Sequence, residues 1–251
     1  MNYLKLKYLS QLGVLAVAIC PALVSFASLP SQSPVRANST EISLQFPPVG
    51  NIGAPRTTAG GGTRSDEPSC VRVKQGEMSL VALMPNRENA GKTATATPTL
   101  YWYVPQTTAT EGEFVLLDKE QNEVYETTFA LPSQPGVVKL SIPTKAALKP
   151  GNSYSWSFMI ICNSQYRNQD KYVEGTIEYA KLNPALKSWL EKQTPLEQAK
   201  LYADNKIWFE ALHTIAQVRS KNPAEWEELL KSVGLEAIAP KPLLDCCTAN
   251  N

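Results

Sequence analysis

Hydrophobic and polar residues alternate along the segment from Ser153 to Cys162. The apolar side chains of one face are Tyr154, Trp156, Phe158, Ile160 and Cys162. Successive side chains of an extended chain point to opposite sides, so a period of two residues predicts a β-strand with one buried face. Shorter runs with the same alternation recur between Cys70 and Ala180, separated by turn residues.

Residues 70–180 are predicted to form an antiparallel β-sandwich, because many short strands with polar turns between them are typical of two packed sheets. The predicted strands are Cys70–Lys74, Ser79–Met84, Thr99–Val104, Glu113–Asp118, Glu123–Phe129, Val137–Ile142, Ser153–Cys162 and Tyr172–Tyr179. If every connection reverses the chain direction, however, the first and the seventh strand place Cys70 and Cys162 at opposite ends. Either one predicted strand is superfluous or a crossover connection intervenes.

The segment from Leu148 to Tyr154 has the pattern Leu-x-Pro-Gly-x-x-Tyr. This pattern resembles the turn before the tyrosine corner of fibronectin type III and immunoglobulin-like sandwiches, in which the tyrosine hydroxyl binds upstream backbone. Cys162 departs from the antibody pattern because it follows the tyrosine by eight residues. The resemblance implies an immunoglobulin- or fibronectin III-like sandwich in which a bridge to Cys162 is not the inter-sheet disulfide of antibody domains.

After Ala180 the apolar residues recur with the period of 3.6 residues that is typical of helices. The predicted helices cover residues 184–192, 195–204, 207–220 and 223–233. Capping side chains followed by proline at the first helical position occur in Asn183-Pro184, Thr194-Pro195 and Asn222-Pro223. Residues 181–235 are therefore predicted to form a helical subdomain, and residues 236–251 a tail.

Residues 199–212 resemble one helical hairpin of the tetratricopeptide type, a repeat that normally stacks in sets of three or more. With a single unit, we expect the hairpin to pack on the sandwich; a hairpin that docks a partner is the alternative. The adjacent rings of Trp208 and Phe209 point in different directions around their helix, so one of them is expected to be a partly exposed partner contact. Burial of both rings, with the helices acting only as a lid, stays open.

Residues 1–27 have the organisation of a secretory signal peptide. Lys5 and Lys7 precede an apolar run that contains Pro21 and is short for a membrane span, and Ser25-Phe26-Ala27 offers a cleavage site. A second, weaker site ends at Ala37. The mature protein is therefore predicted to be exported, with no stable membrane anchor after cleavage.

Residues 28–69 are rich in proline, serine, threonine and glycine and are predicted to form a disordered leader. Their glycine run, Gly60-Gly61-Gly62, lacks the preceding strand and the following helix of a phosphate-binding loop. The chain carries 24 basic and 23 acidic residues. This balance leaves no cationic cluster that would bind nucleic acid, and we expect no cofactor.

Of the five cysteines, Cys20 leaves with the signal. An even number remains, which favours disulfides in an oxidising compartment. Adjacent cysteines such as Cys246 and Cys247 rarely bridge each other, so Cys70–Cys162 is the better pair.

No catalytic or metal site is predicted. His213 is the only histidine, which excludes a multi-histidine metal site, and no serine-elbow motif accompanies it. Scattered carboxylates leave a glycosidase pair formally open. Arg167, Asp170 and Glu174 cluster near Cys162, either as a salt-bridged loop or as a ligand or partner contact.

Three consecutive aromatic residues, Tyr101, Trp102 and Tyr103, lie on one predicted strand. Alternation places Trp102 in the core and leaves the two tyrosines available to stack on a sugar or a peptide. This strand is the basis for a carbohydrate-binding module as an alternative function.

Several segments, taken in order along the mature chain, resemble the cyanobacterial exported family of domain of unknown function 928. They are the Gly-Gly-Gly-Thr-Arg leader, Ala82–Pro85, Pro98–Pro105, Cys162 with Arg167 and Asp170, Val173–Gly175 and the final helices. The resemblance implies a bacterial envelope location and a Cys70–Cys162 pair, and no catalytic residue, cofactor or substrate. The function that we expect is that of an exported, non-enzymatic interaction or adaptor module in the periplasm or at the cell surface, with an envelope protein as partner. A carbohydrate-binding module is the alternative, and a hydrolase comes third.

Overall fold

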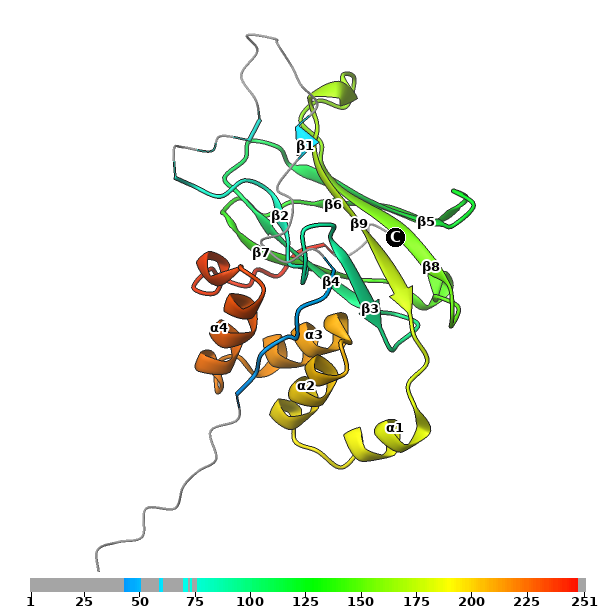
Figure 1. The fold of residues 1–251 in the computed structure, drawn as a ribbon. Helices are drawn as coiled ribbons and strands as arrows, with labels where there is room; N and C mark the ends of the chain where they lie inside the picture. The colour runs from blue at the N-terminus through cyan, green and yellow to red at the C-terminus, as the bar shows by residue number, and fades with distance from the viewer. Residues whose placement is uncertain (1–42, 51–58, 61–69, 72, 74–75, 248–251) are drawn as a thin grey trace, which may run out of the picture. The chain divides into compact units, whose positions relative to one another are not determined.

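The computed structural model describes residues 43–50, 59–60, 70–71, 73 and 76–247. Strands come first along the chain and four α-helices follow (Figure 1). The strands are β1 (Ala59–Gly60), β2 (Val81–Ala82), β3 (Ala90–Thr93), β4 (Thr99–Val104), β5 (Glu111–Asp118), β6 (Glu123–Ala130), β7 (Gly136–Ser141), β8 (Ser153–Ile160) and β9 (Lys171–Tyr179). The helices are α1 (Pro184–Leu190), α2 (Pro195–Asp204), α3 (Trp208–Val218) and α4 (Pro223–Ser232), with short 3-10 turns at Thr144–Ala146, Arg167–Gln169 and Glu236–Ile238.

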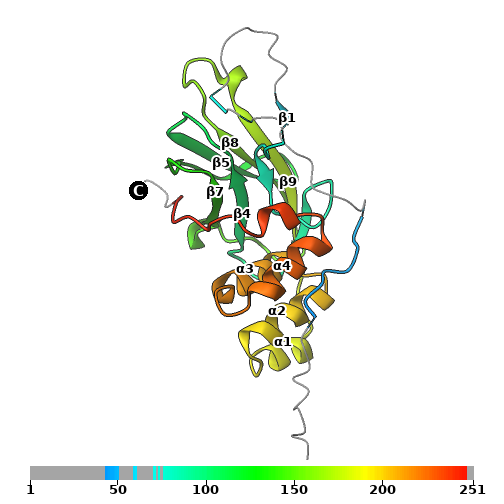
Figure 2. The same ribbon diagram turned by 90° about the vertical axis from the view of Figure 1, so that its left-hand side faces the viewer.

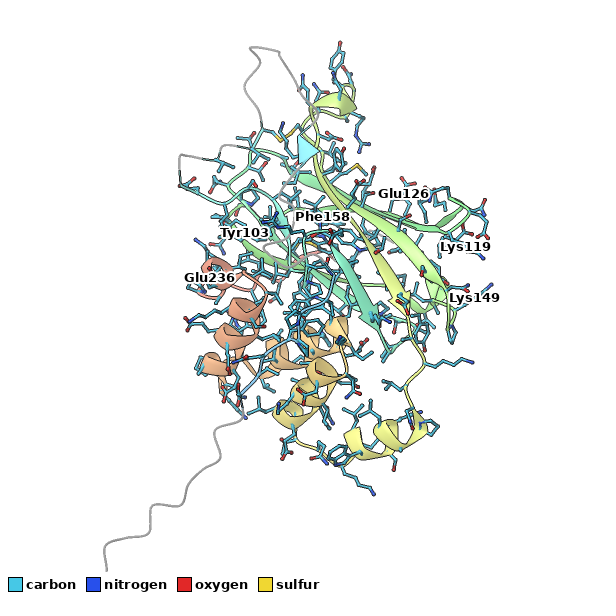
Figure 3. The ribbon with its side chains drawn as sticks, in the orientation of Figure 1. Tyr103, Lys119, Glu126, Lys149, Phe158 and Glu236 are labelled. Carbon is cyan, nitrogen blue, oxygen red and sulfur yellow. A yellow bond between two sulfur atoms is a disulfide. The ribbon has the colours of Figure 1, made fainter. Side chains whose placement is uncertain are left out.

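The strands form two sheets. The larger sheet has the order β1-β9-β8-β5-β6, with β3 also paired to β9, and the smaller has the order β2-β4-β7. Their inner faces meet at Trp102 of β4, whose ring stacks on Phe158 of β8 at a centroid distance of 4.5 Å. Figure 3 shows Phe158 inside the molecule, between the sheets, and Glu126 on the outer side. The chain is therefore a mixed α/β protein in which two mainly antiparallel sheets precede four helices.

One strand departs from an all-antiparallel sandwich. Residues Ala90–Thr93 of β3 pair in parallel with residues 176–179 of β9. Its sequence, Ala-Gly-Lys-Thr, carries no apolar alternation, and the pattern analysis missed it. Within the described residues, the predicted strand Cys70–Lys74 is reduced to a bridge between Val71 and Thr107.

The predicted tyrosine-corner hydrogen bond is present. The backbone N–H of Lys149 donates to the hydroxyl oxygen of Tyr154 at 2.9 Å, and Gly151 supplies the positive φ of 83° that the turn needs. This contact closes the turn before β8. Assignment to the immunoglobulin or fibronectin III class stays a prediction.

Two of the three predicted helix caps have the expected geometry. Thr194 and Glu197 form a capping box at the start of α2, and the side chain of Asn183 accepts from the backbone N–H of Ala185 in α1. Asn222 does not cap α4; its side-chain amide donates to the carbonyl oxygen of Val218 instead.

The smaller sheet is covered on both faces. All six residues of β4 are buried, because the larger sheet covers one side and α3 packs on the other. Figure 2 shows α3 and α4 beside β4 and β7. The C-terminal segment completes this cover: Leu243 bridges to Val137 of β7, and the ammonium group of Lys241 lies 5.8 Å from the centre of the Tyr103 ring.

Residues 43–50 differ from the disordered leader that the composition predicts. They run extended along α4, where the carboxylate of Glu228 accepts from the hydroxyl of Ser43 at 2.6 Å and from the backbone N–H of Leu44 at 2.8 Å. Leu44 and Phe46 are buried. Val49 also packs against the core, so apolar side chains dock this segment.

The described residues contain two disulfides. Cys70 and Cys162 are bonded, with a Cα–Cα distance of 5.3 Å across a sequence separation of 92 residues, as predicted. Cys246 and Cys247 are bonded to each other, against the expectation that adjacent cysteines rarely bridge. Cys247 has a positive φ of 68°.

None of the described helices is both long and apolar enough to cross a bilayer.

Candidate functional site

The aromatic strand does not offer a stacking surface for a sugar. Tyr101 and Tyr103 project from the face of β4 opposite Trp102, as alternation requires, but they are only 3% and 6% exposed. Helix α3 and the C-terminal segment cover that face. The prediction that the tyrosines are available to a ligand is therefore wrong. It assumed that only one face of the smaller sheet is covered, whereas both faces are.

Tyr101 and His213 form a partly buried contact between strand β4 and helix α3. The Tyr101 hydroxyl lies 2.7 Å from Nδ1 of His213, and Nε2 of the same ring lies 3.0 Å from the side-chain amide of Gln217. Burial raises the pKa of Tyr101, while burial and then the positive charge of Lys139 lower the pKa of His213. A neutral imidazole with a contact at each ring nitrogen joins α3 to β4.

The charged cluster near Cys162 is a salt-bridged loop. Arg167 donates to Glu113 of β5 at 3.0 Å and to Asp170, and these hydrogen bonds raise the pKa of Arg167. Asp170 also accepts from the backbone N–H of Cys162 at 2.9 Å. Glu174 was grouped with them, but it lies further along β9 and is exposed. The cluster thus holds the chain beside the disulfide, and its third member is Glu113, which only the β5–β8 register could have revealed.

Trp208 and Phe209 are both buried, with 0% and 1% of their surface exposed. The indole N–H of Trp208 donates to the carbonyl oxygen of Leu83 at 2.8 Å, and the ring of Phe46 packs edge-on against it at 4.9 Å. Phe209 lies against Gly91 of β3 on the other side. The expectation of a partly exposed ring is wrong, because α3 packs against the sandwich, α2 and residues 43–50 at once.

Glu210 of α3 is a buried carboxylate that the sequence did not single out. It accepts hydrogen bonds from the hydroxyls of Thr93 and Thr95 and from the backbone N–H of Ala94, at 2.6, 3.0 and 2.9 Å. These donors lie at the end of β3 and just after it, so the contact ties the helical layer to the sheet. Burial raises the pKa of Glu210, and the hydrogen bonds oppose this shift.

The exposed aromatic residue of the helical layer is Trp189 of α1. Four of the five tryptophans are less than 4% exposed, whereas 57% of Trp189 is exposed. Helix α1 bears Leu186, Trp189 and Leu190 within seven residues, more apolar surface than so short a helix can bury. The sequence analysis did not single out Trp189, and three apolar residues in so short a helix are the signal that could have found it.

A groove lies beside α1, between this helix, α2 and the end of β9. Its volume is about 570 Å³. Apolar and aromatic side chains line it, chiefly Ala94, Tyr179, Leu182, Leu190 and Tyr202. Lys181, Lys187 and Glu191 also line it, and Lys192 follows them in the sequence as an exposed residue. This groove, called the α1 groove below, has apolar and basic lining residues, and Trp189 lies on the same helix without being one of them.

Among the described residues, no group of three or more histidine, cysteine, aspartate or glutamate side chains is placed to hold a metal ion.

A comparison with protein families gives one match. The model of the family described as Domain of Unknown Function (DUF928) matches residues 59–243. The match covers most of the chain and includes both sheets and all four helices. No curated protein matches the chain.

Proposed function

For a chain that belongs to the family Domain of Unknown Function (DUF928), we propose the role of an exported, non-enzymatic adaptor that docks an envelope protein at the α1 groove. The observation that carries the proposal is the exposure of Trp189. Tryptophan is enriched among the residues that dominate binding energy at protein interfaces, and here one tryptophan is exposed on α1, the helix that borders the groove.

The border of the α1 groove favours an acidic partner. Among the residues that line the groove, Lys181 and Lys187 are basic and Glu191 is acidic, and the exposed Lys192 follows them in the sequence. The local charge is therefore positive, although the chain as a whole is nearly neutral. A partner surface with one apolar anchor surrounded by carboxylates complements both the groove and its border.

The candidate catalytic side chains already make hydrogen bonds within the protein, which supports a non-enzymatic role. His213 uses both ring nitrogens in contacts to Tyr101 and Gln217, and Glu210 is saturated by three donors. Proton transfer needs a group that can reach a substrate. These two groups instead tie α3 to the sandwich.

Export to a bacterial envelope, as in a cyanobacterial periplasm or cell surface, is the proposed location. The signal-like residues 1–27 lie outside the described residues, so the support comes from the sequence and from the Cys70–Cys162 bridge. Structural disulfides persist in oxidising compartments and are rare where thiols are kept reduced. A sugar-binding role is not proposed, because the tyrosine strand on which it rested is buried.

Affinity purification from an envelope extract of the source organism tests the adaptor role. The mature protein should retain a defined partner, and Trp189→Ala should lose it without a change in melting temperature. Tyr166→Ala is the matched control, because Tyr166 is equally exposed, at 60%, and lies in the loop between β8 and β9. If the Trp189 variant keeps its partner, or if only the Tyr166 variant loses it, docking at the α1 groove is wrong.

A further inference from the structure

The turn between α2 and α3 contains a lysine where glycine is the usual residue. After α2 ends at Asp204, Lys206 has a φ of +60°. Its N–H donates to the carbonyl oxygen of Ala203, and the N–H of Ile207 donates to that of Tyr202. This pair of hydrogen bonds is a Schellman motif, whose left-handed position is most often glycine because a Cβ is strained there.

The turn after α4 has glycine at the corresponding left-handed position. After α4, Gly234 has a φ of +79° and donates to the carbonyl oxygen of Lys231, while Leu235 donates to that of Leu230. The two turns thus have the same backbone hydrogen bonds, and only the first carries a strained side chain. A strained backbone conformation at Lys206 suggests that its side chain has a function.

Lys206 is one of the residues that line a pocket of about 450 Å³. The pocket lies where β3, β9, residues 46–50 and the α2–α3 turn meet, and it is distinct from the α1 groove. Its wall is mostly apolar and includes Phe46, Val49, Pro85, Ala90 and Ile177. A concave, mainly apolar surface of this size with a few polar groups is typical of a small-molecule site.

Among the charged residues that line this pocket, Lys206 is the one outside an ion pair. The other two charged lining residues, Lys92 and Glu178, pair with each other at 3.0 Å. In the part of the chain that the structure describes, Lys206 has no ion-pair partner. An ammonium group beside an apolar wall attracts an anion that carries an apolar body.

We propose that this pocket binds an amphiphilic anion of the alkyl carboxylate class. The alkyl chain lies on the apolar wall, and the carboxylate lies at the ammonium group of Lys206. The site is separate from the α1 groove, so its occupation does not depend on the adaptor role.

Binding of dodecanoate to the purified mature protein, measured by calorimetry below the micellar concentration, tests this site. Dodecyltrimethylammonium, which has the same chain and the opposite charge, is the ligand control. The protein should bind dodecanoate saturably with one site and at least about tenfold more tightly than the cation, since a tenfold ratio corresponds to one well-placed charge contact.

Two variants separate the charge of Lys206 from its strain. Lys206→Gly should weaken dodecanoate binding about tenfold and raise the melting temperature by roughly 2–4 °C, because the strained Cβ is removed. Lys206→Gln should weaken binding equally with an unchanged melting temperature. Lys231→Gln, which removes an exposed lysine outside the pocket, should bind as the parent does. Absence of saturable binding, or parental affinity in Lys206→Gln, would overturn the proposal.

Discussion

Substitution of Glu210 tests the coupling between the helical layer and the sandwich. In Glu210→Ala the backbone N–H of Ala94 loses its acceptor, while the hydroxyls of Thr93 and Thr95 can still rotate toward other oxygens. A stranded buried N–H costs about 1–3 kcal/mol, and each lost hydroxyl hydrogen bond about 0.5–1 kcal/mol. Relief of the buried charge offsets part of this sum, so the free energy of unfolding should fall by about 2–4 kcal/mol.

Glu210→Gln is the informative companion. Its carboxamide oxygen can still accept from Ala94, and its amide group can donate to Thr95, so a loss of about 1 kcal/mol or less is expected. Burial raises the pKa of Glu210 above that in the unfolded chain, so the folded protein binds this proton more tightly. Stability therefore falls as the pH rises from the ordinary carboxyl pKa through the raised one and then levels off, and the Gln variant lacks this fall.

Urea unfolding followed by tryptophan fluorescence at pH 4.5, 6 and 7.5 measures both effects, since four tryptophans are buried. The reasoning is refuted if Glu210→Ala unfolds within 0.5 kcal/mol of the parent. It is also refuted if the Gln variant loses as much stability as the Ala variant at every pH.

Three further predictions concern export and covalent structure. Cys70→Ser should lower the free energy of unfolding by roughly 2–4 kcal/mol, because the bridge closes a loop across 92 residues, and an unchanged melting temperature would contradict this. Peptide mapping without reduction should recover Cys70 bound to Cys162 and Cys246 bound to Cys247; free thiols at either pair would be the opposite result. Mass spectrometry of the native protein should find its N-terminus just after Ala27, whereas a cytoplasmic protein that begins at Met1 would show that the segment is not a signal.

Local patterns predicted the regular elements well. The alternation in residues 153–162 corresponds to β8, and the capping box at Thr194 marks the first turn of α2. Both depend on neighbours within a few residues. By contrast, β3 has no apolar pattern of its own and exists because β9 offers it an open edge, a long-range condition that no local pattern contains.

The candidate site was harder to predict, because exposure depends on what covers each face. Tyr101, Tyr103, Trp208 and Phe209 were proposed as contacts on the assumption that one side of each element is free. The helical layer and the smaller sheet bury them against each other instead. Trp189, by contrast, was not proposed as a contact and is exposed. Its helix has little to pack against, so this apolar side chain remains in solvent.

The central claim is that a partner docks at Trp189, and a photo-crosslinking amino acid at position 189 tests it most directly. In cells that express the tagged protein, illumination should give one dominant adduct, whose mass spectrum identifies an envelope protein with an acidic contact surface. The same amino acid at position 166, which is equally exposed, should not give that adduct. If position 189 yields no specific adduct, or only the one that position 166 also gives, the chain does not dock its partner at the α1 groove.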